Sequence, residues 1–166
     1  MNQPSLRALL LPGMMIGCFT VFVSIVSDAQ SIWPVSIGSA NWRFGTLGFM
    51  IGTGALPVLG MGLVVVAAAL GEYRKVSWVV GGVALVSGML VLAGMAVFFV
   101  DARTIMAGAG GGDAGAMLGG AMRRTLAIGA LTGPAYLALG LAGIRSARRM
   151  PQSGDRSSLV VGRAGQ

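Results

Sequence analysis

Four long windows without a single charged residue constrain this chain more than any other feature of its sequence. The windows lie between Arg7 and Asp28, Arg43 and Glu72, Lys75 and Asp101, and Arg124 and Arg145, and they hold 20, 28, 25 and 20 residues. A helix needs about 20 apolar residues to cross a hydrocarbon core of roughly 30 Å. The spacing of the charges therefore predicts four membrane spans.

The backbone in these spans has to satisfy its own hydrogen bonds, which leaves helices or a closed barrel. Runs such as 63–70 show none of the alternation that barrel strands need. Only 10% of the residues are charged, against roughly 25% in a soluble domain. We predict an all-α polytopic membrane protein, a four-helix bundle running up-down-up-down. It occupies residues 1–144, with spans at about 6–27, 44–70, 76–100 and 125–144.

The connections differ in length and composition. The short turn at 71–75 predicts that the second and third spans are antiparallel neighbours. Residues 101–124 are rich in glycine and are expected to form a mobile outer loop. Residues 145–166 are basic and polar, and we expect a disordered cytoplasmic tail there. Pro57 stands among glycines within the second span and predicts a kink.

The first span has features of a targeting signal. A basic residue precedes it, and Ser27-Asp28-Ala29 has the small-x-small pattern of a cleavage site. Its apolar stretch is longer than the roughly 7–15 residues of a signal peptide core, so we favour a retained helix over a cleaved one. A lipoprotein signal at Cys18 is the weaker alternative, because the following residues stay apolar.

Lysine and arginine near the helix ends set the expected orientation. With the N-terminus inside, the cytoplasmic side carries Arg7, Arg74, Lys75, Arg145, Arg148 and Arg149, and the outer side carries Arg43, Arg103, Arg123 and Arg124. This bias predicts a multi-pass protein of a bacterial inner membrane with both termini cytoplasmic. We assign the basic residues to topology and lipid headgroups, and expect no nucleic acid, because interleaved aromatic residues are lacking.

Small residues recur down each span at intervals of three and four. The glycines of these rows are Gly13 and Gly17 in the first span, Gly45, Gly48, Gly52 and Gly62 in the second, Gly81 and Gly88 in the third, and Gly129, Gly133, Gly140 and Gly143 in the fourth. Eight of them are assigned to the predicted seam: Gly13, Gly17, Gly48, Gly52, Gly81, Gly88, Gly129 and Gly133. Such spacing lets helix backbones approach closely in lipid. We interpret the rows as a helix-packing seam or a self-association face. Chance is the alternative, because 28 of the 166 residues are glycine.

The chain lacks histidine altogether, which rules out a Ser-His-Asp triad and histidine-ligated haem. The four charge-free windows contain no Asp, Glu, Lys, Arg or His, an argument against a proton-coupled pump. We therefore predict no catalytic residue, no metal and no cofactor. An enzyme at the membrane edge could draw only on Asp28, Arg43, Glu72, Asp101 and Arg103. Asp101 and Arg103 are expected to be solvated charges at the interface.

Two further patterns are weak. Gly110, Gly112 and Gly115 match the dinucleotide-binding pattern G-x-G-x-x-G, but no strand is predicted before them. Methionine is frequent, with 11 residues, and thioethers bind Cu(I). No M-x-x-M repeat clusters them in the spans, so we interpret them as flexible apolar side chains.

The first outer loop, at 28–43, contains Trp33 and Trp42. Tryptophan favours the headgroup level, and an interfacial segment is the simpler interpretation. These residues and Arg43 are also the candidate contacts for a partner protein or for self-association.

The leading functional hypothesis is a non-catalytic subunit or assembly factor of a larger membrane complex. One alternative is a small transporter or channel for an uncharged or lipidic solute, formed by oligomerisation. Its support is Pro57 and Gly133-Pro134, since broken helices often line binding sites. The other alternative is an enzyme at the membrane interface.

Overall fold

The computed structural model describes residues 3–109 and 112–150. Within these ranges every regular element is a helix, and the helices are α1 (Gln3–Ile32), α2 (Ala40–Thr53), α3 (Ala55–Leu70), α4 (Arg74–Ala109) and α5 (Asp113–Arg149). Four stretches are long and apolar enough to cross a membrane: Leu9–Ile32, Ala40–Leu70, Arg74–Gly108 and Gly115–Arg149. The predicted all-α four-helix membrane bundle is confirmed, and the chain is a multi-pass membrane protein.

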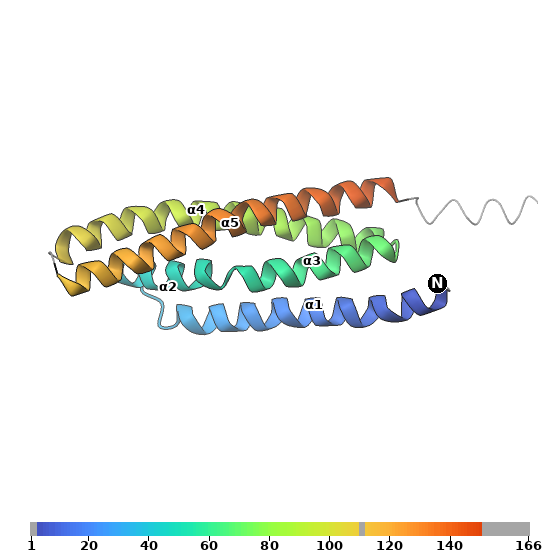
Figure 1. The fold of residues 1–166 in the computed structure, drawn as a ribbon, viewed down its shortest axis with the longest axis horizontal. Helices are drawn as coiled ribbons and strands as arrows, with labels where there is room; N and C mark the ends of the chain where they lie inside the picture. Colours follow the sequence, from blue (N-terminus) through green and yellow to red (C-terminus); the bar gives the residue numbers. More distant parts are fainter. Residues whose placement is uncertain (1–2, 110–111, 151–166) are drawn as a thin grey trace, which may run out of the picture.

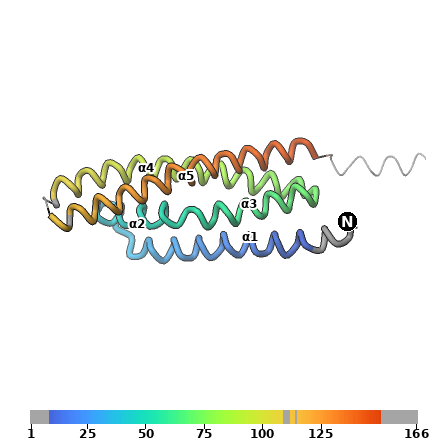
Figure 2. The backbone as a smooth tube through the Cα atoms, in the orientation of Figure 1, coloured from blue at the N-terminus to red at the C-terminus, as the bar shows by residue number. Residues whose placement is uncertain are grey.

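The second span is broken into α2 and α3 at Gly54. Pro57 has no backbone N–H to donate to the carbonyl of Thr53, which removes one helical hydrogen bond. The chain tightens there, so that the Gly54 N–H donates to the Ile51 carbonyl at 3.2 Å. Figure 2 shows α2 and α3 running on as two parts of one span. The predicted kink near Pro57 is confirmed. Pro134, by contrast, lies inside the continuous helix α5.

The four spans alternate in direction, with α2 and α3 forming one span. The start of α1 lies at the same end of the bundle as the end of α5 (Figure 1). The α4–α5 hairpin is the most extensive helix pair, and α2 and α3 pack on both of its helices. A buried cluster of Met61, Ala84 and Tyr136 joins α3, α4 and α5. The centre of the bundle is therefore formed by three spans that pack on one another: α2–α3, α4 and α5.

Helix α1 is peripheral to this centre. It packs on α3 and, near its end, on α2, and within the described residues its backbone does not approach α4 or α5. Apolar side chains such as Phe19 (68% exposed) and Phe22 (63% exposed) cover its outer face. In a multi-pass protein this face meets lipid. Helix α1 also ends well short of the α4–α5 turn (Figures 1 and 2).

The glycine-rich segment differs from its prediction as a loop over 101–124. Helix α4 continues to Ala109 and α5 begins at Asp113, so nearly all of the segment is helical. Extending an existing helix costs far less than nucleating one, and alanine and methionine favour helix. Gly112 adopts φ +136°, a conformation that only glycine takes readily. The tail also starts later than predicted, because residues 145–149 belong to α5. Residues 151–166 lie outside the described residues.

Glycine positions on α4 and α5 mark a close approach of these two helices along much of their length. A Cβ added at Gly81 would lie 3.0 Å from the Gly140 carbonyl oxygen, and one at Gly140 would lie 2.8 Å from the Gly81 oxygen. Gly88 and Gly133 face leucine side chains of the opposite helix at 2.8 Å on the same measure. Gly129 faces Met95 at 2.5 Å. A side chain at Gly81 or Gly140 would press on the opposite backbone, whereas at Gly88, Gly129 and Gly133 it would displace a leucine or methionine side chain.

The glycines of α1 and α2 divide into two groups. A Cβ at Gly17 would lie 2.6 Å from the carbonyl oxygen of Gly60, which was not assigned to the predicted seam. Gly48 faces the ring of Phe98 at 3.2 Å. Gly13 and Gly52 have nothing within 4 Å of an added Cβ. The structure thus brings six of the eight predicted seam glycines against a neighbouring helix and leaves these two open.

Candidate functional site

A cavity of about 270 Å³ lies between α1 and α4, whose described residues do not pack on each other. This volume is close to the lower end of the roughly 300–1,000 Å³ typical of small-molecule sites. Its walls come from every helix, and the lining residues are Val21, Ile25 and Asp28 of α1, Leu47, Met50, Ile51 and Gly54 of α2 and its end, Pro57 and Met61 of α3, Val83, Ser87, Leu90, Val91 and Gly94 of α4, and Tyr136 of α5. The lining is apolar apart from a few polar groups.

The broken second span forms one wall of the cavity. Gly54 and Pro57 both lie on it, so the irregular backbone faces the cavity and not a packed interface. The Tyr136 hydroxyl donates to the Gly54 carbonyl at 3.4 Å, a long hydrogen bond from a side chain that is 4% exposed. The Gly54 carbonyl also accepts the Val58 N–H at 3.5 Å, so both of its lone pairs are engaged, each by a long hydrogen bond.

Asp28 provides the only carboxylate on the cavity wall. Its Oδ1 accepts a hydrogen bond from the Thr53 hydroxyl at 3.2 Å. The same hydroxyl lies 3.1 Å from the Phe49 carbonyl oxygen and 3.3 Å from that of Met50, and its one proton serves a single acceptor at a time. No cation of the described residues pairs with Asp28. The carboxylate therefore keeps most of its capacity to accept hydrogen bonds.

Asp28 lies deeper in the bundle than the sequence predicts. The first span was predicted to end at residue 27, with Asp28 in the loop, but α1 continues to Ile32. Asp28 contacts Thr53, which follows Arg43 by ten residues on α2, or about 15 Å at the helical rise. Asp28 lies within the apolar stretch Leu9–Ile32, and Arg43 and Asp101 lie within the second and third stretches. The expectation that charged residues lie outside the spans is wrong for these three residues.

The rim of the cavity is open to the outside of the bundle between α1 and α4. Ile25 on α1 is 59% exposed, and Leu90 on α4 is 67% exposed. Both residues belong to the membrane-spanning parts of their helices. A molecule dissolved in the bilayer can therefore enter sideways, without passing through water.

A second polar feature, an ion pair between α2 and α4, closes the bundle beyond the cavity. Arg43 donates from Nε and Nη2 to the two carboxylate oxygens of Asp101, at 2.8 and 2.7 Å. Its Nη1 donates to the Ile37 carbonyl at 2.8 Å. Phe44 and Phe98 stack beside the pair with ring centroids 4.7 Å apart. The pair fixes the ends of α2 and α4, and its geometry is that of a structural clamp.

The ion pair corrects one prediction. Asp101 was expected to be a solvated charge, but it is 5% exposed and fully paired. Arg43 uses one N–H of each of its three nitrogens within this chain, and its side chain is 31% exposed, so its role as a partner contact stays a prediction. Arg103 is exposed and lies 5.5 Å from the Phe99 ring centre. Glu72 is exposed in the α3–α4 turn, at the other end of the bundle. The five candidate residues of an edge enzyme do not converge on one site.

The two tryptophans of the first connection have different roles. The Trp42 indole N–H donates to the Ile32 carbonyl at 3.2 Å and so ties α2 to the end of α1. Trp33 is 79% exposed and stands beside the exposed Val35 and Ile37. Of the three predicted contact residues, Trp33 is the one whose side chain stands out from the bundle.

The cavity itself was missed by sequence reasoning. Pro57 signalled the broken helix, but nothing in the spacing of residues shows that α1 stands away from α4. The pattern G-x-G-x-x-G has no binding context either, since helix α4 precedes Gly112, and Gly110 lies outside the described residues. No family model, curated protein or solved structure matches this chain.

Proposed function

We propose that this protein is a small membrane transporter for a lipidic solute, which binds in the cavity between α1 and α4. The observation that carries the proposal is the single carboxylate, Asp28, on the wall of an apolar cavity that opens toward lipid. An ionisable group at membrane depth marks a functional site by default, because an unpaired charge there is costly. The proposal includes no chemical step, cofactor or metal.

The polar groups of the cavity define the ligand. The Asp28 carboxylate is the free acceptor, because the Gly54 carbonyl already accepts from the Tyr136 hydroxyl and the Val58 N–H. The ligand should therefore present a hydrogen-bond donor, and an amine satisfies a desolvated carboxylate best. The remaining walls are aliphatic side chains and methionines, which suit a short hydrocarbon body.

Transport is favoured over static binding by the broken span. Discontinuous helices in membranes often surround solute sites, and their irregular backbone gives the wall freedom to move. Helix α1 is held mainly by α3, so it can shift without disturbing the α4–α5 hairpin. A movement of α1 would alternately open and close the gap between α1 and α4.

The proposed location is a bacterial inner membrane with both termini in the cytoplasm. The end of the bundle with the α5 C-terminus carries Arg74, Lys75, Arg145, Arg148 and Arg149. At the opposite end, Arg43 is neutralised by Asp101. The orientation rule counts lysine and arginine alone, and these five residues against Arg43, Arg103, Arg123 and Arg124 at the opposite end support the orientation with the α5 end inside.

Binding is tested with n-octylamine, n-octanol and octanoate, three probes with similar hydrocarbon bodies, on the protein in lipid nanodiscs. We expect isothermal titration calorimetry to give the amine the highest affinity. Asp28→Asn should weaken amine binding about tenfold, as expected for the loss of one charge-assisted contact. Asp113→Asn, at the start of α5, is the matched control and should leave binding unchanged. Flux of a labelled octylamine into proteoliposomes should fall in parallel.

Two results would contradict the proposal. One is equal binding of all three probes by the wild-type protein and Asp28→Asn. The other is binding that survives Ser87→Phe, which places a large ring in the cavity while leaving Asp28 intact. Binding without flux would reduce the proposal to a membrane receptor for the same ligand.

The second candidate is the non-catalytic subunit or assembly factor. It is favoured by the exposed apolar residues Trp33, Val35 and Ile37 in the α1–α2 connection. Purification from the native membrane in mild detergent, with native gel and mass spectrometry, tests it. A stoichiometric partner that is lost on Trp33→Ser would support the subunit. A homogeneous particle without partners would contradict it.

A further inference from the structure

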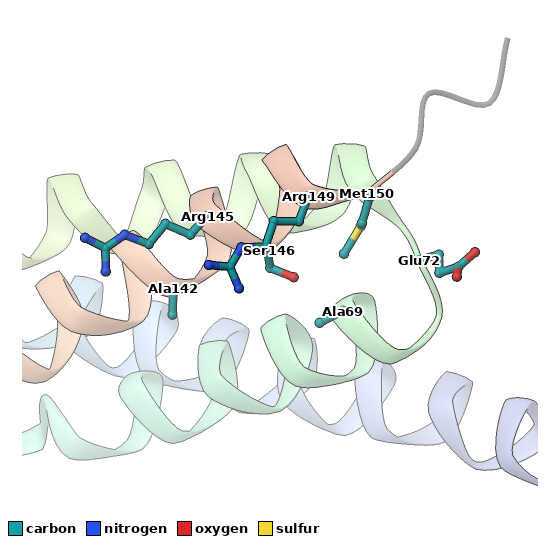
Figure 3. Close-up of a pocket in the computed structure, with 7 residues that line it drawn as sticks. All are labelled: Ala69, Glu72, Ala142, Arg145, Ser146, Arg149 and Met150. Atoms are coloured by element: carbon teal, nitrogen blue, oxygen red, sulfur yellow. The ribbon is translucent and has the colours of Figure 1, made fainter. Parts of the chain in front are cut away.

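A second pocket, of about 570 Å³, lies at the other end of the bundle, between the end of α3 and the last two turns of α5. Arg145 and Arg149 stand on its α5 side, one helical turn apart, with Ser146 between them. Ala69 and Ala142 form its base, and their small side chains leave the space free. Figure 3 shows both arginine side chains extending in the same direction along α5.

The two guanidinium groups have no carboxylate partner among the described residues. Glu72 contributes to the rim of the pocket but points away from the arginines (Figure 3). The reason is the turn that carries it: Glu72 adopts φ 58°, and the Tyr73 N–H donates to the Ala68 carbonyl at 2.8 Å to close α3. The pocket therefore presents two guanidinium groups and a hydroxyl group on its α5 side, with the Glu72 carboxylate on its rim and directed away from them.

We propose that this pocket binds the phosphate of an anionic lipid headgroup. Guanidinium groups match phosphate oxygens with paired hydrogen bonds, and the Ser146 hydroxyl adds a donor. The pocket lies at the end of the spans formed by α3 and α5, the depth at which headgroups are found. Basic pockets between helices at this level suit anionic headgroups.

The lipid is favoured over free phosphate by the surface beside the pocket. Leu70 follows Ala69 on α3 and is 61% exposed, and Leu141 precedes Ala142 on α5 and is 46% exposed. These leucines offer an apolar surface for an acyl chain next to the phosphate position. The inference does not depend on the proposed transport, since it uses the opposite end of the bundle.

The test measures affinity for short-chain lipids that differ only in the headgroup. Dioctanoyl phosphatidylglycerol, dioctanoyl phosphatidylcholine and inorganic phosphate are titrated onto the full-length protein in a neutral detergent by microscale thermophoresis. We expect phosphatidylglycerol to bind at least about tenfold more tightly than the other two, as one charge-assisted contact predicts.

Variants separate the pocket from general positive charge. Arg145→Gln with Arg149→Gln should lose the preference for phosphatidylglycerol. Arg123→Gln with Arg124→Gln removes the same charge from exposed positions elsewhere on α5 and should keep it. Ala142→Phe retains both arginines but fills the base of the pocket, and should also weaken binding. This variant keeps the test valid where the double arginine variant fails to fold.

Each outcome decides the proposal. Preference for phosphatidylglycerol that is lost in the Arg145 and Arg149 variant and in Ala142→Phe supports it. Equal affinity for inorganic phosphate would overturn the lipid as the source of the anion. If the Arg145 and Arg149 variant and the Arg123 and Arg124 variant lost the same affinity for phosphatidylglycerol, the pocket would be excluded as the binding site, because binding would then follow net charge alone.

Discussion

Helices α5 and α1 each lie against a neighbour with glycine at the contact, but the two contacts differ in extent. Helix α5 meets α4 along much of its length, through Gly81, Gly140 and Gly143, and also contacts α2 and α3. Helix α1 has one close approach, Gly17 against Gly60, and no approach to α4 within the described residues. The first contact forms a rigid hairpin, and the second leaves a cavity.

The difference shows where a small membrane protein can place a ligand site. In lipid, helices associate through close packing and hydrogen bonds and gain no hydrophobic free energy from meeting each other. A helix that packs on one side of the bundle only therefore tolerates a gap beside it, because lipid can fill the gap. The α1–α4 gap carries Asp28 and the broken wall at Gly54, while the α4–α5 contact is closed.

The largest expected effect is at the α4–α5 contact. In Gly140→Leu the new Cβ would lie 2.8 Å from the backbone oxygen of Gly81, which cannot move aside as a side chain can. We expect a loss of about 3 kcal/mol in the free energy of unfolding, at the upper part of the usual range for overpacking. Unfolding by SDS titration of the purified protein measures it.

Gly82→Leu is the control, because Gly82 adjoins the contact on α4 and has nothing within 4 Å of an added Cβ. An equal loss in both variants would show that the α4–α5 glycines act through helix propensity and not through close packing.

A smaller effect is expected at the α1–α3 contact. In Gly17→Leu the Cβ would lie 2.6 Å from the Gly60 oxygen, but among the described residues α1 packs only on α3 and α2 and can move outward. We expect a loss of about 1–2 kcal/mol. Hydrogen exchange should rise in α1 peptides and stay unchanged in α5 peptides. Faster exchange in both helices would contradict the independence of α1, and Gly13→Leu, with open space around it, is the matched control.

The smallest effect is expected at Gly52, where the sequence favours a large one. Gly52 belongs to the predicted seam, yet an added Cβ meets nothing within 4 Å. Gly52→Leu should therefore change the free energy of unfolding by no more than about 0.5 kcal/mol, as for other positions without close contacts. A strong loss would mean that Gly52 contacts a second copy of the chain or a partner.

The contrast between Gly52 and Gly140 also shows what the sequence can predict. Charge-free windows predict the four spans, because helix length and membrane thickness are fixed. Pro57 predicts the kink, since the missing N–H acts locally. Which glycine meets another helix depends on the rotation and offset of whole helices, and three-residue and four-residue spacing recurs on several faces at once. Gly60 was therefore missed and Gly52 was included.

The ionisable residues show the same limit. Asp28 was placed in a loop because the apolar run ends before it, yet α1 continues for another turn and brings its carboxylate to Thr53. Arg43 and Asp101 are 58 residues apart in the chain, and no local pattern reveals that they pair. The site depends on these offsets, so the sequence predicts the bundle better than it predicts the cavity.

The central claim is that the gap between α1 and α4 is a lateral binding site. Photolabelling with a diazirine derivative of n-octylamine in nanodiscs, followed by peptide mass spectrometry, tests it most directly. The account predicts labels on Ile25, Met50 and Leu90, reduced by unlabelled octylamine and by Asp28→Asn. Labels that follow exposure along the outer face of α1, at Phe19 and Phe22, with no competition, would contradict it.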